Sequence, residues 1–259
     1  MGSAAILRVE VERGLADRVP AALTPKIRQA PELFATGLAD VDAMLNGGIP
    51  RGCITELSGN PSSGRTCFAL SAIGSITRSG AACAWIDVSD ALSPDSAAAA
   101  GIQLNRLLWL RMTSKGNANH STKEKSLSNL DQSIKAADLL LQAGGFAAIV
   151  LDMSDVQAQH ASRIPLSHWY RFRLAAELAR TALIVLTQSS CTSSCASLVL
   201  RCESPITETF SRNGETALFS HRQYVLTRER NRNEGPSVPF KKPSSRAEWD
   251  ANTAWCGVR

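Results

Sequence analysis

Short apolar runs alternate with helical patterns along most of this chain. Four runs have the length and composition of buried β-strands: 83–88, 106–111, 147–152 and 182–187. Helical spacing separates them, as in Ile134, Ala137 and Leu141. Buried strands that alternate with helices are typical of parallel sheets. The pattern therefore predicts an α/β fold, a mainly parallel sheet with helices on both faces.

The pattern changes to β after Ser197. The segment SLVLRCE comes first, and ETALFSHRQYVLTRER follows a turn at 212–214. Two β-favouring segments joined by such a turn predict an antiparallel β extension at the C-terminal side of the parallel sheet.

We expect three parts. Residues 1–35 form an amphipathic helix and a proline-bearing arm, and residues 36–240 form the core. Within the core, residues 113–129 are almost without apolar side chains, which predicts a flexible surface loop. Residues 241–259 are basic and contain proline, which predicts a partly disordered tail.

The segment GNPSSGRT fits a phosphate-binding loop. The pattern G-x-x-x-x-G-K-[ST] is met with Arg65 in place of lysine, between a β-favouring run and a helical one. A planar guanidinium can grip phosphate oxygens, although its geometry differs from that of lysine. A plain glycine-serine turn is the alternative. The predicted nucleotide-binding residues of the loop are Gly59, Asn60, Pro61, Ser62, Ser63, Gly64, Arg65 and Thr66.

Charge, cysteine content and hydrophobicity limit the possible partners and the cellular compartment. Lysine and arginine total 28 against 23 acids, so a net charge of +5 permits a nucleic-acid or acidic partner without requiring one. Seven cysteines without paired metal spacing indicate reduced thiols in a cytoplasmic protein. No stretch is long and apolar enough for a membrane span, so we expect no membrane partner.

From Thr36 to about Phe240 the chain resembles the RecA family. The resemblance rests on the order of four segments: ATGLADVDAMLNGGIPRGCITELSGNPSSGRT, AWIDVSDALSP, AAIVLDMSD and LIVLTQSS. Within that family the sequence is most similar to the ImuA-type RecA-like proteins, on the GGIPRG turn, SSGRT and AAAAGIQLNRLLWLR. The resemblance implies a RecA-like P-loop NTPase core with ATP and Mg as cofactors, both with weak or lost binding.

The resemblance also implies roles for strand-end residues. Thr66 and Asp152 would be on the magnesium side, and Gln188 would sense the terminal phosphate. The alternative for Asp152 is a helix-capping role, and the alternative for Gln188 is a surface amide. Arg228 and Arg230, on one face of a strand, would reach the nucleotide of a neighbouring subunit, which implies self-assembly; a solvated edge strand is the alternative.

Two departures from the family pattern argue against a motor. Ser89 occupies the place of the catalytic glutamate, and Asp90 beside it points to another face, so we expect no catalytic residue and slow or absent hydrolysis. The second DNA-binding loop is reduced to SSCTSSCA and has no aromatic residue, so single-stranded DNA would bind weakly.

These observations predict an accessory factor in DNA repair and SOS mutagenesis, acting in translesion synthesis at the nucleoid. The implied partners are RecA and an ImuB-type inactive polymerase homologue. Two alternatives are a DNA-dependent ATPase of recombinational repair, with Asp90 or another acid as its base, and a RecA-like regulator such as a cell-division inhibitor.

Overall fold

The chain divides into two compact units, Met1–Ala30 and Pro31–Arg259. The computed structural model describes residues 6, 7, 10, 31–112, 122–204, 221–232 and 244–252. The described residues of the first unit are 6, 7 and 10, and all three are helical. Most of the expected N-terminal helix therefore lies outside the described residues. No helix in the described part of the chain is long and apolar enough to cross a membrane.

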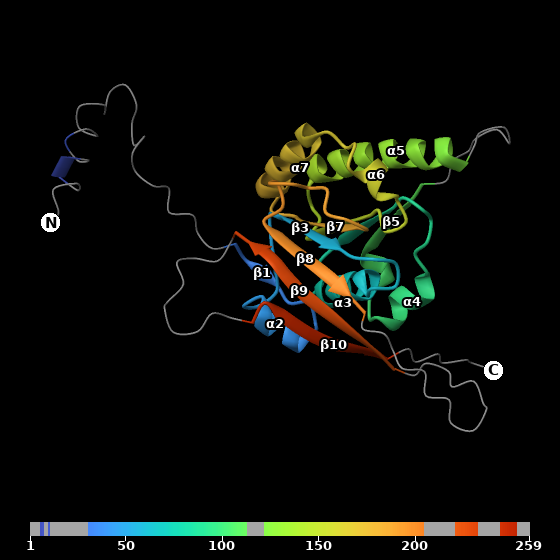
Figure 1. Cartoon of the computed structure of the whole chain (residues 1–259), viewed down its shortest axis with the longest axis horizontal. Coiled ribbons are helices and arrows are strands. Elements are labelled where there is room, and N and C mark those ends of the chain that lie inside the picture. The colour runs from blue at the N-terminus through green and yellow to red at the C-terminus, as the bar shows by residue number, and fades with distance from the viewer. Residues whose placement is uncertain are drawn as a thin grey trace. The chain divides into compact units, whose positions relative to one another are not determined.

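The second unit is built on an eight-stranded sheet with the strand order β10-β9-β8-β3-β7-β6-β4-β5 (Figure 1). Neighbouring strands from β8 to β5 run parallel, whereas β9 pairs antiparallel with β8 and β10, which confirms the predicted fold class. The strands are β3 (Ile54–Ser58), β4 (Cys83–Asp87), β5 (Leu107–Arg111), β6 (Ala148–Asp152), β7 (Ala182–Thr187), β8 (Leu198–Glu203), β9 (His221–Asn231) and β10 (Arg246–Asn252). A separate two-stranded sheet pairs β1 (Leu33–Phe34) with β2 (Ile49–Pro50).

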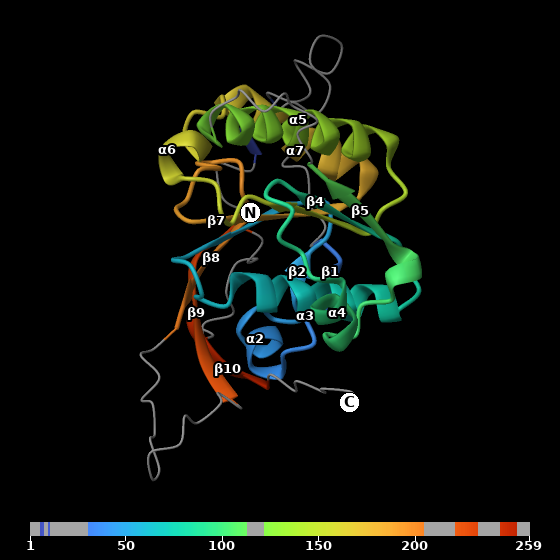
Figure 2. The ribbon, with the colours of Figure 1, turned by 90° about the vertical axis from the view of Figure 1, so that its right-hand side faces the viewer.

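Helices cover both faces of the large sheet, as Figure 2 shows. The helical segments are α2 (Ala39–Met44), α3 (Arg65–Arg78), α4 (Pro94–Ala99), η1 (Leu104–Arg106), α5 (Thr122–Ala143), α6 (Ala158–Ala161) and α7 (Leu166–Ala179). Helices α5 to α7 lie on one face and α2 to α4 on the other. The central strands therefore contribute side chains to two cores: Leu57 of β3 packs in the core with α3, and Ile54 in the core with α7.

The segment over 113–129, predicted to be a flexible loop, is partly helical. Within the expected loop over 113–129, residues 122–129 begin α5, and 113–121 lie outside the described residues. Helical spacing continues to the buried residues Leu130 and Ile134, so the helix starts earlier than composition suggested.

The tail over 241–259, which we expect to be partly disordered, contains strand β10. Ala247 and Trp249 of this strand are buried, while Arg246 and Glu248 between them are exposed. This alternation is that of a half-buried strand. Residues 246–252 are therefore an ordered part of this tail that the sequence did not specify, because period-two burial outweighs the polar composition.

Candidate phosphate-binding site

The loop between β3 and α3 lies where the sequence predicts a phosphate-binding loop. Its two glycines are required by close contacts. A Cβ at Gly59 would lie 2.4 Å from the carbonyl oxygen of Cys202, and a Cβ at Gly64 would lie 2.5 Å from the ring of Tyr224. Gly64 also has a φ of 93°, which L-residues rarely adopt.

Helix α3 begins with open backbone donors. In the described part of the chain, no group accepts a hydrogen bond from the backbone N–H of Gly64, Arg65 or Thr66. Unpaired N–H groups and the positive end of the helix dipole favour an anion at this position. The backbone of the loop therefore fits a phosphate group.

The side chain of Arg65 turns into the protein. It is only 5% exposed, and its Nη1 donates to the carbonyl oxygen of Thr187 at the end of β7. Its Nη2 lies 3.5 Å from the carbonyl oxygen of Ser154, which follows β6. Burial lowers the pKa of Arg65, and the nearby carboxylates of Asp152 and Asp155 oppose that shift. Arg65 thus connects the phosphate-binding loop to the ends of two strands.

The predicted residues Asp152 and Gln188 lie beside Arg65. Gln188 donates from Nε2 to the carbonyl oxygen of Ser154 at 3.2 Å, the same oxygen that faces Arg65. Oδ1 of Asp152 accepts from the backbone N–H of Ser154 at 3.0 Å. Burial raises the pKa of Asp152, and the hydrogen bonds from Ser154 oppose this rise. The ends of β6 and β7 thus bring these three side chains together.

The metal role of Thr66 and Asp152 stays a prediction. The described residues contain no group of three or more His, Cys, Asp or Glu side chains that could hold a metal ion. A magnesium ion that is bound with a nucleotide takes one or two carboxylates and completes its shell with phosphate oxygens and water. The single buried carboxylate of Asp152 fits that chemistry.

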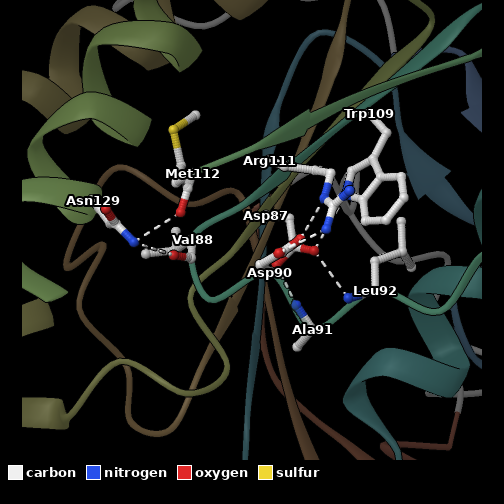
Figure 3. Close-up of polar contacts among 9 residues, drawn as sticks. All are labelled: Asp87, Val88, Asp90, Ala91, Leu92, Trp109, Arg111, Met112 and Asn129. Carbon is white, nitrogen blue, oxygen red and sulfur yellow. Dashed lines mark hydrogen bonds and ion pairs between the residues drawn. The ribbon is translucent and has the colours of Figure 1, made fainter. Parts of the chain in front are cut away.

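Asp87, at the end of β4, organises the loop that follows it (Figure 3). Its Oδ1 accepts from the N–H of Ala91 at 3.0 Å, and its Oδ2 accepts from the N–H of Leu92 at 2.9 Å. Oδ2 also accepts from Nε1 of Trp109 at 3.2 Å. Both oxygens are therefore used by the protein itself, which is the role of a polar residue at a strand end.

Asp90 is held by an arginine on the neighbouring strand. Nε and Nη2 of Arg111 donate to its two oxygens at 2.6 and 2.8 Å (Figure 3). The guanidinium also lies 4.7 Å from the ring centre of Trp109. The hydrogen bond from Arg111 lowers the pKa of Asp90. Ser89, which the sequence resemblance aligns with a glutamate, is exposed and has no carboxylate.

Sequence reasoning missed Glu56, a fully buried acid in the middle of β3. Oε1 accepts from the N–H groups of Cys191 and Thr192 at 2.6 and 3.2 Å, and Oε2 accepts from the hydroxyls of Ser190 and Thr192 at 2.7 and 2.6 Å. Four donors satisfy the carboxylate and fix the short loop after β7. An acid within an otherwise β-favouring run was the available signal.

Sequence reasoning also missed an aromatic cluster beside the loop. The ring of Trp249 lies 5.3 Å from that of Tyr224 and 6.3 Å from that of Phe68. Tyr224 contacts Gly64, and Phe68 belongs to α3, so the C-terminal strands support the start of this helix.

Arg228 and Arg230 do not share a face. A β-bulge in the pairing of β8 with β9 interrupts the alternation between them. Nη1 of Arg228 donates to the carbonyl oxygen of Met44 in α2 at 3.2 Å, whereas Nη2 of Arg230 donates to that of Ser193 after β7. The expectation of a common face is therefore wrong, and the predicted contacts between subunits stay a prediction.

Comparisons with known proteins relate this chain to a family. The sequence profile of the RecA N-terminal domain matches residues 9–159. RecA of Crocosphaera subtropica is 33% identical over 128 residues, which are 49% of this chain and 34% of that protein. RecA of Kineococcus radiotolerans is 34% identical over 131 residues, which are 50% of this chain and 33% of that protein. The matched region thus spans about a third of the length of these relatives.

The fold is also found in a solved structure. The crystal structure of the RadB recombinase is similar with a TM-score of 0.56, and the match covers 83% of this chain and 94% of that one. The sequence identity is 17%, so this similarity shows a shared fold.

Proposed function

Because this chain belongs to the RecA family, we propose that it is a RecA-like accessory factor of DNA repair and not a motor. In this proposal the protein acts in SOS mutagenesis, during translesion synthesis, through contacts with other proteins. Its partners are RecA and an ImuB-type polymerase homologue.

One observation carries the proposal. The predicted phosphate-binding loop has its glycines and an open helix N-terminus, while Ser89 stands where the resemblance to the RecA family implies a catalytic glutamate. The two acids next to Ser89, at the end of β4 and in the loop after it, are engaged by other groups. Asp87 accepts three hydrogen bonds, and Asp90 is paired with Arg111. A serine hydroxyl does not take a proton from water at neutral pH. This arrangement supports phosphate binding without turnover.

ATP with magnesium, when bound, would supply a charged polyphosphate chain at the loop. The N–H groups of residues 64–66 would hold its phosphates, and Thr66 and Asp152 would be on the metal side. Gln188 would be at the terminal phosphate. The guanidinium of Arg65, in the position of the usual lysine, is already engaged by the carbonyl oxygens of Thr187 and Ser154, and a phosphate would compete with these contacts. We therefore propose that nucleotide binding is weak or structural.

Direct contact with single-stranded DNA would be weak in this proposal. The loop after β7 is short, and Glu56 holds three of its residues, Ser190 to Thr192. A loop that is tied to the sheet cannot open to insert between bases. Arg228 and Arg230 are the proposed contacts with the nucleotide of a neighbouring subunit, although the bulge limits them to different faces.

The test uses the purified chain with RecA on single-stranded DNA. We expect the added chain to change the rate at which RecA releases phosphate, to bind the ImuB-type homologue and to promote no strand exchange by itself. Failure to bind either protein would refute the proposal. Phosphate release by this chain alone, stimulated by single-stranded DNA, would instead support the DNA-dependent ATPase.

A further inference from the structure

Helix α7 carries an apolar row on its solvent side. Four large side chains spaced by four residues are exposed by 44, 44, 57 and 86%: Leu166, Tyr170, Leu174 and Leu178. The opposite face of the same helix holds the buried residues Trp169, Phe172 and Ala176. The row therefore exceeds what packing of α7 on the sheet requires. It spans about 18 Å along the helix, which is the length of roughly three turns of a partner helix.

A group of arginines lies near Tyr170, in the N-terminal half of this row. The hydroxyl of Tyr170 lies 3.5 Å from Oγ of Ser194, whose carbonyl oxygen accepts from Nη1 of Arg232 at 2.8 Å. Arg230 donates to the preceding carbonyl oxygen, that of Ser193.

Arg173 on α7 joins this group. Burial raises the pKa of Cys195, and the charges of Arg173, Arg232 and Arg230 oppose that rise, so all three lie within electrostatic range of this cysteine. Within the described ranges, none of these three arginines forms an ion pair with a carboxylate. In addition, Nε of Arg230 is buried without a hydrogen-bond partner there.

From these two features we propose that α7 is a docking surface for an amphipathic helix of a partner protein. The apolar side of the partner helix covers the row from Leu166 to Leu178, and acidic side chains at one of its ends meet Arg173, Arg230 and Arg232. Apolar anchors supply affinity in such interfaces, while complementary charge selects the partner and its direction. None of the residues of this surface belongs to the phosphate-binding loop, so the proposal does not rest on nucleotide binding.

A second copy of the chain fits this surface poorly. Arg173 lies on one side of the row, so in an antiparallel pair of α7 helices centred on the row it would approach Arg173 of the other copy. In a parallel pair it would approach Arg171, whose charge is partly balanced by the ion pair with Asp138. Like charges across an interface oppose association. The charge distribution therefore favours a partner of opposite sign.

Two synthetic peptides of about 18 residues provide the probe, since that length exceeds the row by a turn or more. Both place leucines on one helical face; the first has glutamates beside them near one end, and the second has lysines there. Calorimetry with the full chain should show that the acidic peptide binds and that its affinity falls with added salt. Leu174→Glu should lower this affinity by roughly tenfold or more. The matched control is Leu104→Glu, on η1, which is exposed to a similar degree and should have no effect.

Arg232→Glu should weaken binding of the glutamate-bearing peptide and should not weaken binding of the lysine-bearing peptide. Circular dichroism and melting temperature should be the same for all variants, because the substituted side chains are exposed. Equal binding of both peptides, or an unchanged affinity in Leu174→Glu, would overturn the proposal. So would a concentration-dependent dimer that Leu174→Glu abolishes, because that result would assign the row to a second copy.

Discussion

The most informative perturbation of the fold is the removal of the Glu56 carboxylate. This fully buried group accepts two backbone N–H bonds, from Cys191 and Thr192, and two hydroxyl bonds. In Glu56→Leu the hydroxyls can rotate toward other acceptors, but the two N–H groups cannot. An unsatisfied buried donor costs about 1–3 kcal/mol, so we expect a loss of about 4 kcal/mol in the free energy of unfolding.

Glu56→Gln separates hydrogen bonding from charge. The amide oxygen can still accept from both N–H groups, and the NH₂ group can donate to the hydroxyls of Ser190 and Thr192 after these rotate. The expected loss is therefore smaller, about 1–2 kcal/mol. Urea unfolding measures both variants, with the exposed Glu248→Gln as the control, for which we expect a change below about 0.5 kcal/mol. A loss below about 1 kcal/mol in Glu56→Leu would refute the reasoning.

Three further predictions concern the site and its supports. Trp249→Ala should lower the free energy of unfolding by about 3–5 kcal/mol, because this ring packs between Tyr224 and Phe68, whereas the exposed Tyr170→Ala should change it little in the same urea titration. Asp152→Asn should raise stability at neutral pH. A carboxyl with a raised pKa in the folded state favours the protonated form, so its ionised form weakens folding as pH rises, and melting temperatures at pH 4 and 7 should show the gain only at the higher pH. Arg111→Ala should lower stability at neutral pH. Its effect should disappear as pH falls through the pKa of Asp90, which lies below the ordinary value of 3.8; an effect that persists in acid would contradict the role of this ion pair.

Much of the sheet could be predicted from the sequence because its strands are buried on both faces. Runs such as those at 147–152 and 182–187 are apolar without interruption, and they lie at β6 and β7. Strand β10 escaped prediction since the polar Glu248 stands between Ala247 and Trp249, the buried apolar residues in the part of the strand whose burial is described. Their partners, Tyr224 and Phe68, are distant in the chain, and no local pattern encodes such contacts.

The candidate site was predicted in part for a similar reason. Gly59 and Gly64 are local requirements of the loop, so the motif identified them. The inward turn of Arg65 depends on carbonyl groups of two other strands, which sequence cannot place. The bulge that separates Arg228 from Arg230 arises from pairing between β8 and β9, and strand alternation alone predicts the opposite arrangement.

The central claim is that the loop binds phosphate while the acid that would drive hydrolysis is gone. Phosphate release from ATP and magnesium, measured with and without single-stranded DNA, tests it most directly. We expect no phosphate release above that of buffer. The protein should still bind a labelled ATP analogue more tightly than its Thr66→Ala variant does. Release that single-stranded DNA stimulates and that Thr66→Ala abolishes would contradict the account, since it would require a base that neither Asp87 nor Asp90 can supply.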